Sequence, residues 1–116
     1  MKTLSEIAKE VSEASGQPHR LSELKLEIAV MYTELSDKFG DIQIKKAEYW
    51  KYKEFDFNGE LRPKPVSDKS VEMHWNLTEK GKEDIKLRYS LKALEKLLSA
   101  INSAMFTANT ESRNQY

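Results

Sequence analysis

The sequence predicts a mainly α-helical fold: a helical hairpin of two long helices, a short N-terminal helix, and a protruding loop or β-hairpin between the long helices. Two stretches place apolar residues at alternating steps of three and four, which is the period of one helix face. Residues 55–77, between them, lose this period. With 116 residues, 39% of them hydrophobic and 33% charged, the chain is expected to form one polar helical domain over residues 1–106.

The short helix is expected to begin at Thr3. Thr3 and Glu6 have the spacing of a capping box, in which each side chain accepts a backbone N–H that the helix start leaves unpaired. Gly16 and Pro18 then stop the helical pattern. The apolar face of this helix consists of Leu4, Ile7, Ala8, Val11 and Ala14.

The first long helix is expected to begin near Leu21 and to continue past Tyr49. Gly40 interrupts its apolar face and is less favourable than alanine within a helix by roughly 1 kcal/mol. Because the pattern resumes nearly in phase after Gly40, one long helix that bends there is preferred to two separate helices. The heptad-like face consists of Leu21, Leu24, Ile28, Met31, Leu35, Phe39, Ile42, Tyr49 and Tyr52.

The connection at 55–77 is expected to contain a turn. Asn58 followed by Gly59 is the strongest two-residue hairpin pattern, and Pro63 and Pro65 exclude a regular helix around them. Further on, residues 71–77 alternate apolar and polar side chains as a strand does, although some of them also fit one helix face. The second half of the connection is therefore strand or helix.

The final helix has the clearest pattern, and Thr78 or Asn76 is expected to cap its start, with Gly81 weakening the first turn. Residues 107–116 are polar and predicted to form a flexible tail. A long apolar face needs a partner, so we expect self-association or a protein partner on this helix. The predicted oligomer or partner interface consists of Leu87, Leu91, Leu94, Leu98, Ile101, Met105 and Trp75.

The sequence contains no enzyme motif, and no catalytic residue, metal ligand set or cofactor is predicted. Cysteine is absent, and no glycine-rich phosphate loop, GxSxG or HExxH occurs. His19 and His74 lie far apart in the chain, without an acidic cluster at ligand spacing. No apolar run reaches the length of a membrane span or of a signal peptide, so a cytoplasmic protein without membrane contact is expected.

Residues 45–53 combine four lysines with three aromatic rings and only one acid. Lysines attract phosphates and exposed rings stack on bases, which is how single-stranded nucleic acid is bound. Tyr49 and Tyr52 also fit the buried face of the helix, whereas Trp50 falls on a different face. A second basic run, residues 80–96, lies in the final helix. The predicted nucleic-acid-binding residues are Lys45, Lys46, Trp50, Lys51, Lys53, Lys82 and Lys86.

Three stretches in this order, "KAEYWKY" from Lys46, "DKSVEM" from Asp68 and "LRYSLKALEKLLSAINSAM" from Leu87, give the chain a resemblance in arrangement to the small helical recombination mediators of tailed phages. Those proteins load a recombinase onto single-stranded DNA and assemble as rings. The resemblance implies single-strand binding through Lys45, Lys46, Lys51 and Lys53.

The first hypothesis is therefore a non-enzymatic phage or prophage accessory protein in DNA recombination or replication. It would be homo-oligomeric, bind single-stranded nucleic acid and a protein partner, and work in the host cytoplasm. One alternative is a small phage inhibitor that binds a host or defence protein, with Trp50 and Trp75 as anchors, because tryptophan is frequent in binding hot spots. A virion or scaffolding component is another alternative.

Overall fold

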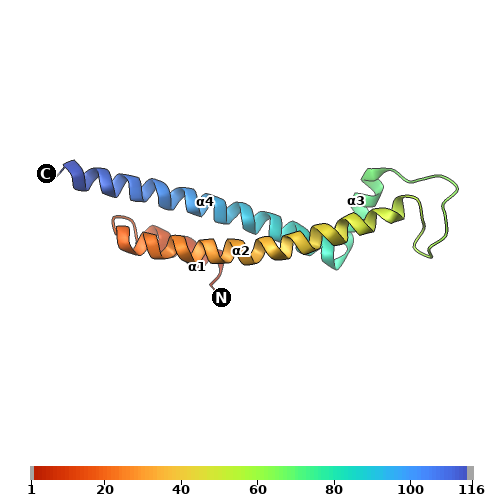
Figure 1. Ribbon diagram of the computed structural model, residues 1–116, viewed down its shortest axis with the longest axis horizontal. Helices are drawn as coiled ribbons and strands as arrows, with labels where there is room; N and C mark the ends of the chain where they lie inside the picture. The colour runs from red at the N-terminus through yellow and green to blue at the C-terminus, as the bar shows by residue number, and fades with distance from the viewer. Residues whose placement is uncertain (1, 115–116) are drawn as a thin grey trace. The chain divides into compact units, whose positions relative to one another are not determined.

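The computed structural model of the chain describes residues 2–114, with side chains over residues 2–107. It confirms the mainly helical prediction, because four α-helices and one short 3-10 helix account for most of the chain (Figure 1). No strand occurs in the described residues. The elements are α1 (Leu4–Glu13), α2 (Pro18–Tyr49), η1 (Trp50–Lys53), α3 (Asp68–Leu77) and α4 (Glu79–Asn114).

The start of α1 has the predicted capping box. Glu6 N donates to Thr3 Oγ1 at 3.1 Å, and Thr3 N donates to Glu6 Oε2 at 3.3 Å. The helix stops before Gly16, whose φ of +82° lies in the left-handed region that favours glycine. Pro18 then becomes the first residue of α2, a position that needs no backbone N–H.

One long helix is confirmed at Gly40, because α2 continues through it without a break. Gly40 is exposed, and a methyl group added there would meet no atom within 4 Å. At its end α2 tightens into η1, so the helical path reaches Lys53.

The chain divides into two compact units, and α2 and α4 contribute residues to both. In its described part, unit 1 comprises the residues up to Leu35 and those from Tyr89 onward. Within unit 1, Lys2 forms two ion pairs: its Nζ lies 2.8 Å from Glu10 Oε2 and 3.0 Å from Glu27 Oε2. The core of unit 1 consists of Ile7, Val11, Ala14, Leu21, Leu24, Ile28, Leu94 and Ile101.

The apolar face of α4 is largely used within the chain. Leu94 and Ile101 are fully buried in the core of unit 1, and Leu87 is buried in unit 2. These three predicted interface residues are thus unavailable to a partner in this structure. Leu91, Leu98 and Met105 are partly buried.

Unit 2 comprises Ser36–Arg88 and includes η1 packed against α3. Residues 68–77 form α3, so the strand alternative for them is wrong. Val71 and Trp75, one helical turn apart, are both buried, whereas Met73 and Leu77 are exposed. Ser67 caps this helix by accepting the Ser70 N–H at 3.1 Å. The helical period therefore prevails over the two-residue alternation.

The predicted turn at Asn58 and Gly59 forms, but the β-hairpin alternative is wrong. A single antiparallel bridge joins Phe55 and Leu61. Asp56 closes the turn, because its Oδ1 accepts the N–H groups of Asn58 at 2.9 Å and Glu60 at 3.0 Å. Pro63 and Pro65, which follow directly, have no N–H to extend a ladder.

Thr78 caps α4 as predicted, with its Oγ1 accepting the Gly81 N–H at 2.9 Å. The same hydroxyl donates to the Trp75 carbonyl oxygen at 2.6 Å, which ties the end of α3 to the start of α4. At its other end α4 continues to Asn114, so the backbone of residues 107–114, which were predicted to form a flexible tail, is described as helix. Residues 115 and 116 of that tail lie outside the described part. Within residues 2–114, no helix has the length and hydropathy to cross a membrane.

Candidate nucleic-acid interface

All seven predicted nucleic-acid-binding residues lie in unit 2. The end of α2 carries Lys45 and Lys46, and η1 carries Trp50 with two further lysines. The remaining two predicted residues, Lys82 and Lys86, lie in the first turns of α4.

Three of the six predicted lysines are paired with carboxylates. Lys53 Nζ lies 3.0 Å from Asp68 Oδ1, Lys82 Nζ 3.6 Å from Glu79 Oε1, and Lys46 Nζ 3.8 Å from Asp84 Oδ2. The pairs of Lys53 and Lys82 are solvent-exposed, and such pairs are weak enough to exchange for a phosphate. The Lys46 side chain is only 18% exposed and points at a buried acid.

The other three predicted lysines form no ion pair within the described residues. Lys45, Lys51 and Lys86 are exposed and, within the described residues, have no carboxylate oxygen within 4.0 Å. Lys51 Nζ lies 5.1 Å from the centre of the Tyr52 ring, so the ammonium group makes a cation–π contact with that ring. These three lysines are the available cations of the predicted set.

Trp50 does not present a free ring. It is partly buried, its indole N–H donates to Asp68 Oδ1 at 3.1 Å, and Lys46 Nζ lies 6.0 Å from its ring centre. The hydrogen bonds from Lys53 and Trp50 also lower the pKa of the Asp68 carboxyl. The indole is thus held as part of the junction between η1 and α3.

The best-connected polar group of unit 2 is Asp84, which is 1% exposed. Its Oδ1 accepts the Gln43 side-chain N–H at 2.7 Å, and its Oδ2 accepts the Trp75 indole N–H at 3.1 Å. Arg88 donates to Oδ1 from the next turn at 3.3 Å. Burial alone would raise the pKa of Asp84, but the hydrogen bonds from Trp75 and Gln43 and the charges of Arg88 and Lys46 lower it below its usual value.

This network was not predicted from the sequence. Trp75 was expected in a partner interface, whereas its ring is 3% exposed and hydrogen-bonded inside unit 2. The one local pattern that could have pointed to it is the four-residue step from Asp84 to Arg88, but that step is common on solvated helix faces.

The lowered pKa of Asp84 predicts a specific pH dependence. A carboxyl whose pKa is lower in the folded state stabilises that state above its usual pKa, and this contribution is lost as the pH falls through the lowered value. We expect the difference in free energy of unfolding between the wild type and Asp84→Asn to be constant near neutral pH and to shrink below about pH 4. Urea unfolding of both proteins from about pH 7 to about pH 2, followed by circular dichroism, measures it; a difference that stays constant down to the lowest pH would contradict the prediction.

Aromatic rings form a continuous chain in unit 2. The ring centre of Tyr49 lies 5.4 Å from that of Trp75 and 4.9 Å from that of Tyr52. Tyr52 is in turn 4.9 Å from Phe57, and Phe57 is 5.7 Å from His74. The chain is buried at its Trp75 end, whereas Phe57 and His74 at the other end are exposed. Tyr49 and Tyr52, which the sequence places on the buried helix face, are half-buried between these ends.

A cavity of about 140 Å³ opens beside these rings. Its walls come from α2, η1, the connection and α3, and they include Tyr49, Tyr52, Phe57, Arg62, Ser70 and His74. The Arg62 side chain is fixed there, because its Nε donates to the backbone oxygens of Tyr52 at 3.1 Å and Phe55 at 3.2 Å. Phe57, Arg62 and His74 could not be recognised as site residues from the sequence, since the contact between the connection and α3 has no local pattern.

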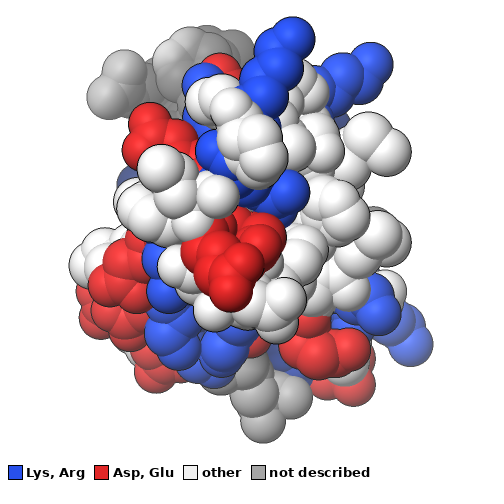
Figure 2. All heavy atoms as spheres, turned by 90° about the vertical axis from the view of Figure 1, so that its right-hand side faces the viewer, with Lys and Arg blue, Asp and Glu red and all other residues white. Residues whose placement is uncertain are grey.

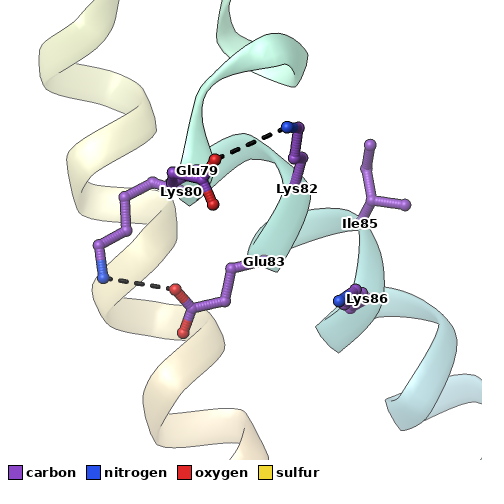
Figure 3. A pocket seen from close by; sticks show the side chains of 6 residues that line it. All are labelled: Glu79, Lys80, Lys82, Glu83, Ile85 and Lys86. Carbon is purple, nitrogen blue, oxygen red and sulfur yellow. Dashed lines mark hydrogen bonds and ion pairs between the residues drawn. The ribbon is translucent and has the colours of Figure 1, made fainter.

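Lys82 and Lys86 line a different hollow, an open depression along the start of α4 (Figure 3). Four of its lining residues form two ion pairs along α4, Glu79 with Lys82 at 3.6 Å and Lys80 with Glu83 at 3.3 Å. These acids offset most of its positive charge. On the face of unit 2 drawn in Figure 2, Lys and Arg are likewise interspersed with Asp and Glu, beside a broad uncharged area. The basic residues are therefore scattered and do not form one continuous basic surface on this face.

Comparison of the chain with protein-family models, with curated proteins and with solved structures finds no match.

Proposed function

We propose that the chain is a non-enzymatic accessory protein that binds single-stranded nucleic acid through unit 2. The observation that supports it best is the position of Lys51, an exposed cation without a carboxylate partner among the described residues, over the Tyr52 ring that lines the aromatic cavity. Lys45, Lys86 and the fixed Arg62 add further donors for phosphate in the same unit. Cations beside partly open aromatic rings are the chemistry of single-strand binding.

The resemblance to phage recombination mediators supports a role in phage or prophage DNA recombination or replication. In that role the protein acts in the host cytoplasm, as a homo-oligomer with a protein partner. Self-association would use the partly buried and exposed apolar residues of the chain, since Leu94 and Ile101 are already covered in the core of unit 1.

Because few lysines are free, we expect binding that is weak and moderately sensitive to salt. For single strands the logarithm of the affinity falls with that of the salt concentration by about 0.7 for each phosphate neutralised, so three lysines give a slope of about −2. Raising the salt about fourfold should then weaken binding roughly 15-fold. Fluorescence anisotropy with a labelled oligo-dT measures this directly.

The variant Lys45→Glu/Lys51→Glu should bind more weakly, with a slope nearer zero. Lys25→Glu/Lys92→Glu is the matched control, since it makes the same change in net charge at two exposed lysines of unit 1. Absence of binding at low salt, or an equal effect of both variants, would overturn the proposed function.

A second candidate, a protein-binding inhibitor or assembly component, is favoured by exposed apolar side chains in unit 2. Leu61 is 71% exposed on the connection and Leu77 72% exposed on α3. Trp75, a predicted anchor, is buried, so Leu61 and Leu77 would contact the partner in its place. For this candidate, Leu61→Asp would abolish stoichiometric binding to a protein partner, and Lys51→Glu would leave it unchanged.

A further inference from the structure

We infer that the aromatic cavity of unit 2 takes one nucleobase of a bound single strand. The inference rests on the proposed function and goes beyond it, because it makes stacking in the cavity, in addition to the lysines, a source of affinity. Four side chains carry it: Tyr52 and Phe57 as ring walls, and Arg62 and His74 as polar groups at the edge of the cavity.

The size of the cavity suits one base. Its volume of about 140 Å³ corresponds to four or five water molecules at about 30 Å³ each, which is roughly the space of a single pyrimidine ring. A nucleotide with its sugar and phosphate would not fit inside, so the backbone of the strand would remain outside. Lys51 does not line the cavity, but its Nζ is 5.1 Å from the centre of the Tyr52 ring that does.

The rings are placed for stacking. Tyr52 and Phe57 have their centres 4.9 Å apart with a 44° tilt, so neither covers the other face to face. Phe57 is 59% exposed, and a large exposed phenylalanine on a closed turn leaves apolar surface in water that a stacked base would cover. The Asp56 and Arg62 hydrogen bonds hold the turn around it, so little further ordering is needed on binding.

The polar groups suit the mixed donors and acceptors of a base edge. Tyr49, Tyr52, Ser70 and His74 line the cavity, and within the described residues their side-chain hydroxyl and ring nitrogen atoms have no hydrogen-bond partner. The guanidinium of Arg62 lies over one face of the Phe57 ring, with its carbon 6.0 Å from the ring centre. Its Nε donates to the backbone, and within the described residues its terminal nitrogens make no hydrogen bond, so they can donate to a base oxygen or a phosphate. A purely apolar ligand would leave all of these groups unpaired.

The test compares two strands on the full chain at low salt, a labelled oligo-dT and a strand of the same length in which abasic sites replace the bases. Both carry the same phosphates, so the lysines bind them equally. We expect the wild type to bind the abasic strand about tenfold more weakly. Equal affinity for the two strands would overturn the inference and leave the proposed function standing, whereas no binding to either strand would overturn both.

Two phenylalanine variants test whether the preference for the base-bearing strand arises in this cavity. Phe57→Leu keeps an apolar side chain but removes the ring, and it should remove the preference for the base-bearing strand. Phe55→Leu is the matched control, because Phe55 lies on the same turn, is 39% exposed and does not line the cavity. A preference that survives in Phe57→Leu, or that Phe55→Leu removes equally, would place the stacking outside this cavity and overturn the inference. The comparison of the two strands on the wild type needs no variant, so a folding defect in either would not obscure the result.

Discussion

Replacing Asp84 with alanine is expected to lower the free energy of unfolding by about 3 kcal/mol at neutral pH. The carboxylate is 1% exposed and holds the side chains of Gln43 and Trp75, each from a different helix. Its loss leaves the buried Trp75 N–H without an acceptor and removes the counter-charge of Lys46 and Arg88. The value lies at the lower end of the range for broken buried pairs because Arg88 is half exposed and stays hydrated. Urea unfolding followed by circular dichroism measures it.

Glu83→Ala is the matched control for Asp84→Ala. Glu83 precedes Asp84 on α4 and pairs with Lys80 at 3.3 Å on the surface, so its removal should change the free energy of unfolding by less than about 1 kcal/mol. A loss below about 1 kcal/mol for Asp84→Ala as well would contradict the view that this carboxylate organises unit 2.

Gly81→Ala is expected to destabilise the protein by about 2 kcal/mol or more, although alanine is the better helix former. Gly81 is buried in the first turn of α4. A methyl group built there overlaps the carbonyl oxygen of Trp75 and lies 2.6 Å from its carbonyl carbon. That carbonyl is fixed by the N–H of Thr78 at 3.0 Å and by the Thr78 hydroxyl, so α3 would have to move away from α4.

Gly40→Ala, at the other helical glycine, is expected to raise the free energy of unfolding, whereas Gly81→Ala is expected to lower it. Nothing lies within 4 Å of a methyl group at Gly40, so the higher helix propensity of alanine should stabilise the protein by about 0.5–1 kcal/mol. Thermal unfolding of the two variants and the wild type measures both changes in stability, the expected gain for Gly40→Ala and the expected loss for Gly81→Ala. A stabilising effect of Gly81→Ala, equal to that of Gly40→Ala, would show that the corner between α3 and α4 is loose.

The helices could be predicted from the sequence because their causes are local. Thr3 and Glu6 lie within one turn, the apolar residues from Leu21 to Tyr49 repeat along one face, and Thr78 caps the helix that follows it. Residues 71–77 were ambiguous because a seven-residue segment fits a two-residue and a four-residue period about equally well. Burial of Val71 with Trp75, which depends on the rest of unit 2, decides between them.

The candidate site could be predicted only in part. The lysines of residues 45–53 were found by their density, but which of them are free depends on Asp68 and Asp84, which lie well apart from them in sequence. Trp50 and Trp75 were both assigned to binding because tryptophan is rich in contact area. Each instead donates its indole N–H to a carboxylate of unit 2, a contact between distant segments that no spacing rule gives.

The role of Gly81 also depends on a contact between segments that the sequence does not reveal. The sequence marks it as a weak point in the first turn of α4, and helix propensity alone supports that interpretation. The close approach to the Trp75 carbonyl gives glycine a positive role there, because only a residue without a side chain lets the two helices meet at this corner.

The two tryptophans also determine how this protein can be observed in solution. Trp50 and Trp75 both lie in unit 2, and the chain has no others, so intrinsic indole emission reports that unit and is silent on unit 1. Far-ultraviolet circular dichroism, in contrast, averages over the helices of both. Superimposable denaturation curves from the two probes would mean that the units unfold as one cooperative block, and separated curves would give each unit its own transition. Because both tryptophans lie in unit 2, comparing tryptophan fluorescence with circular dichroism measures whether the two units unfold together.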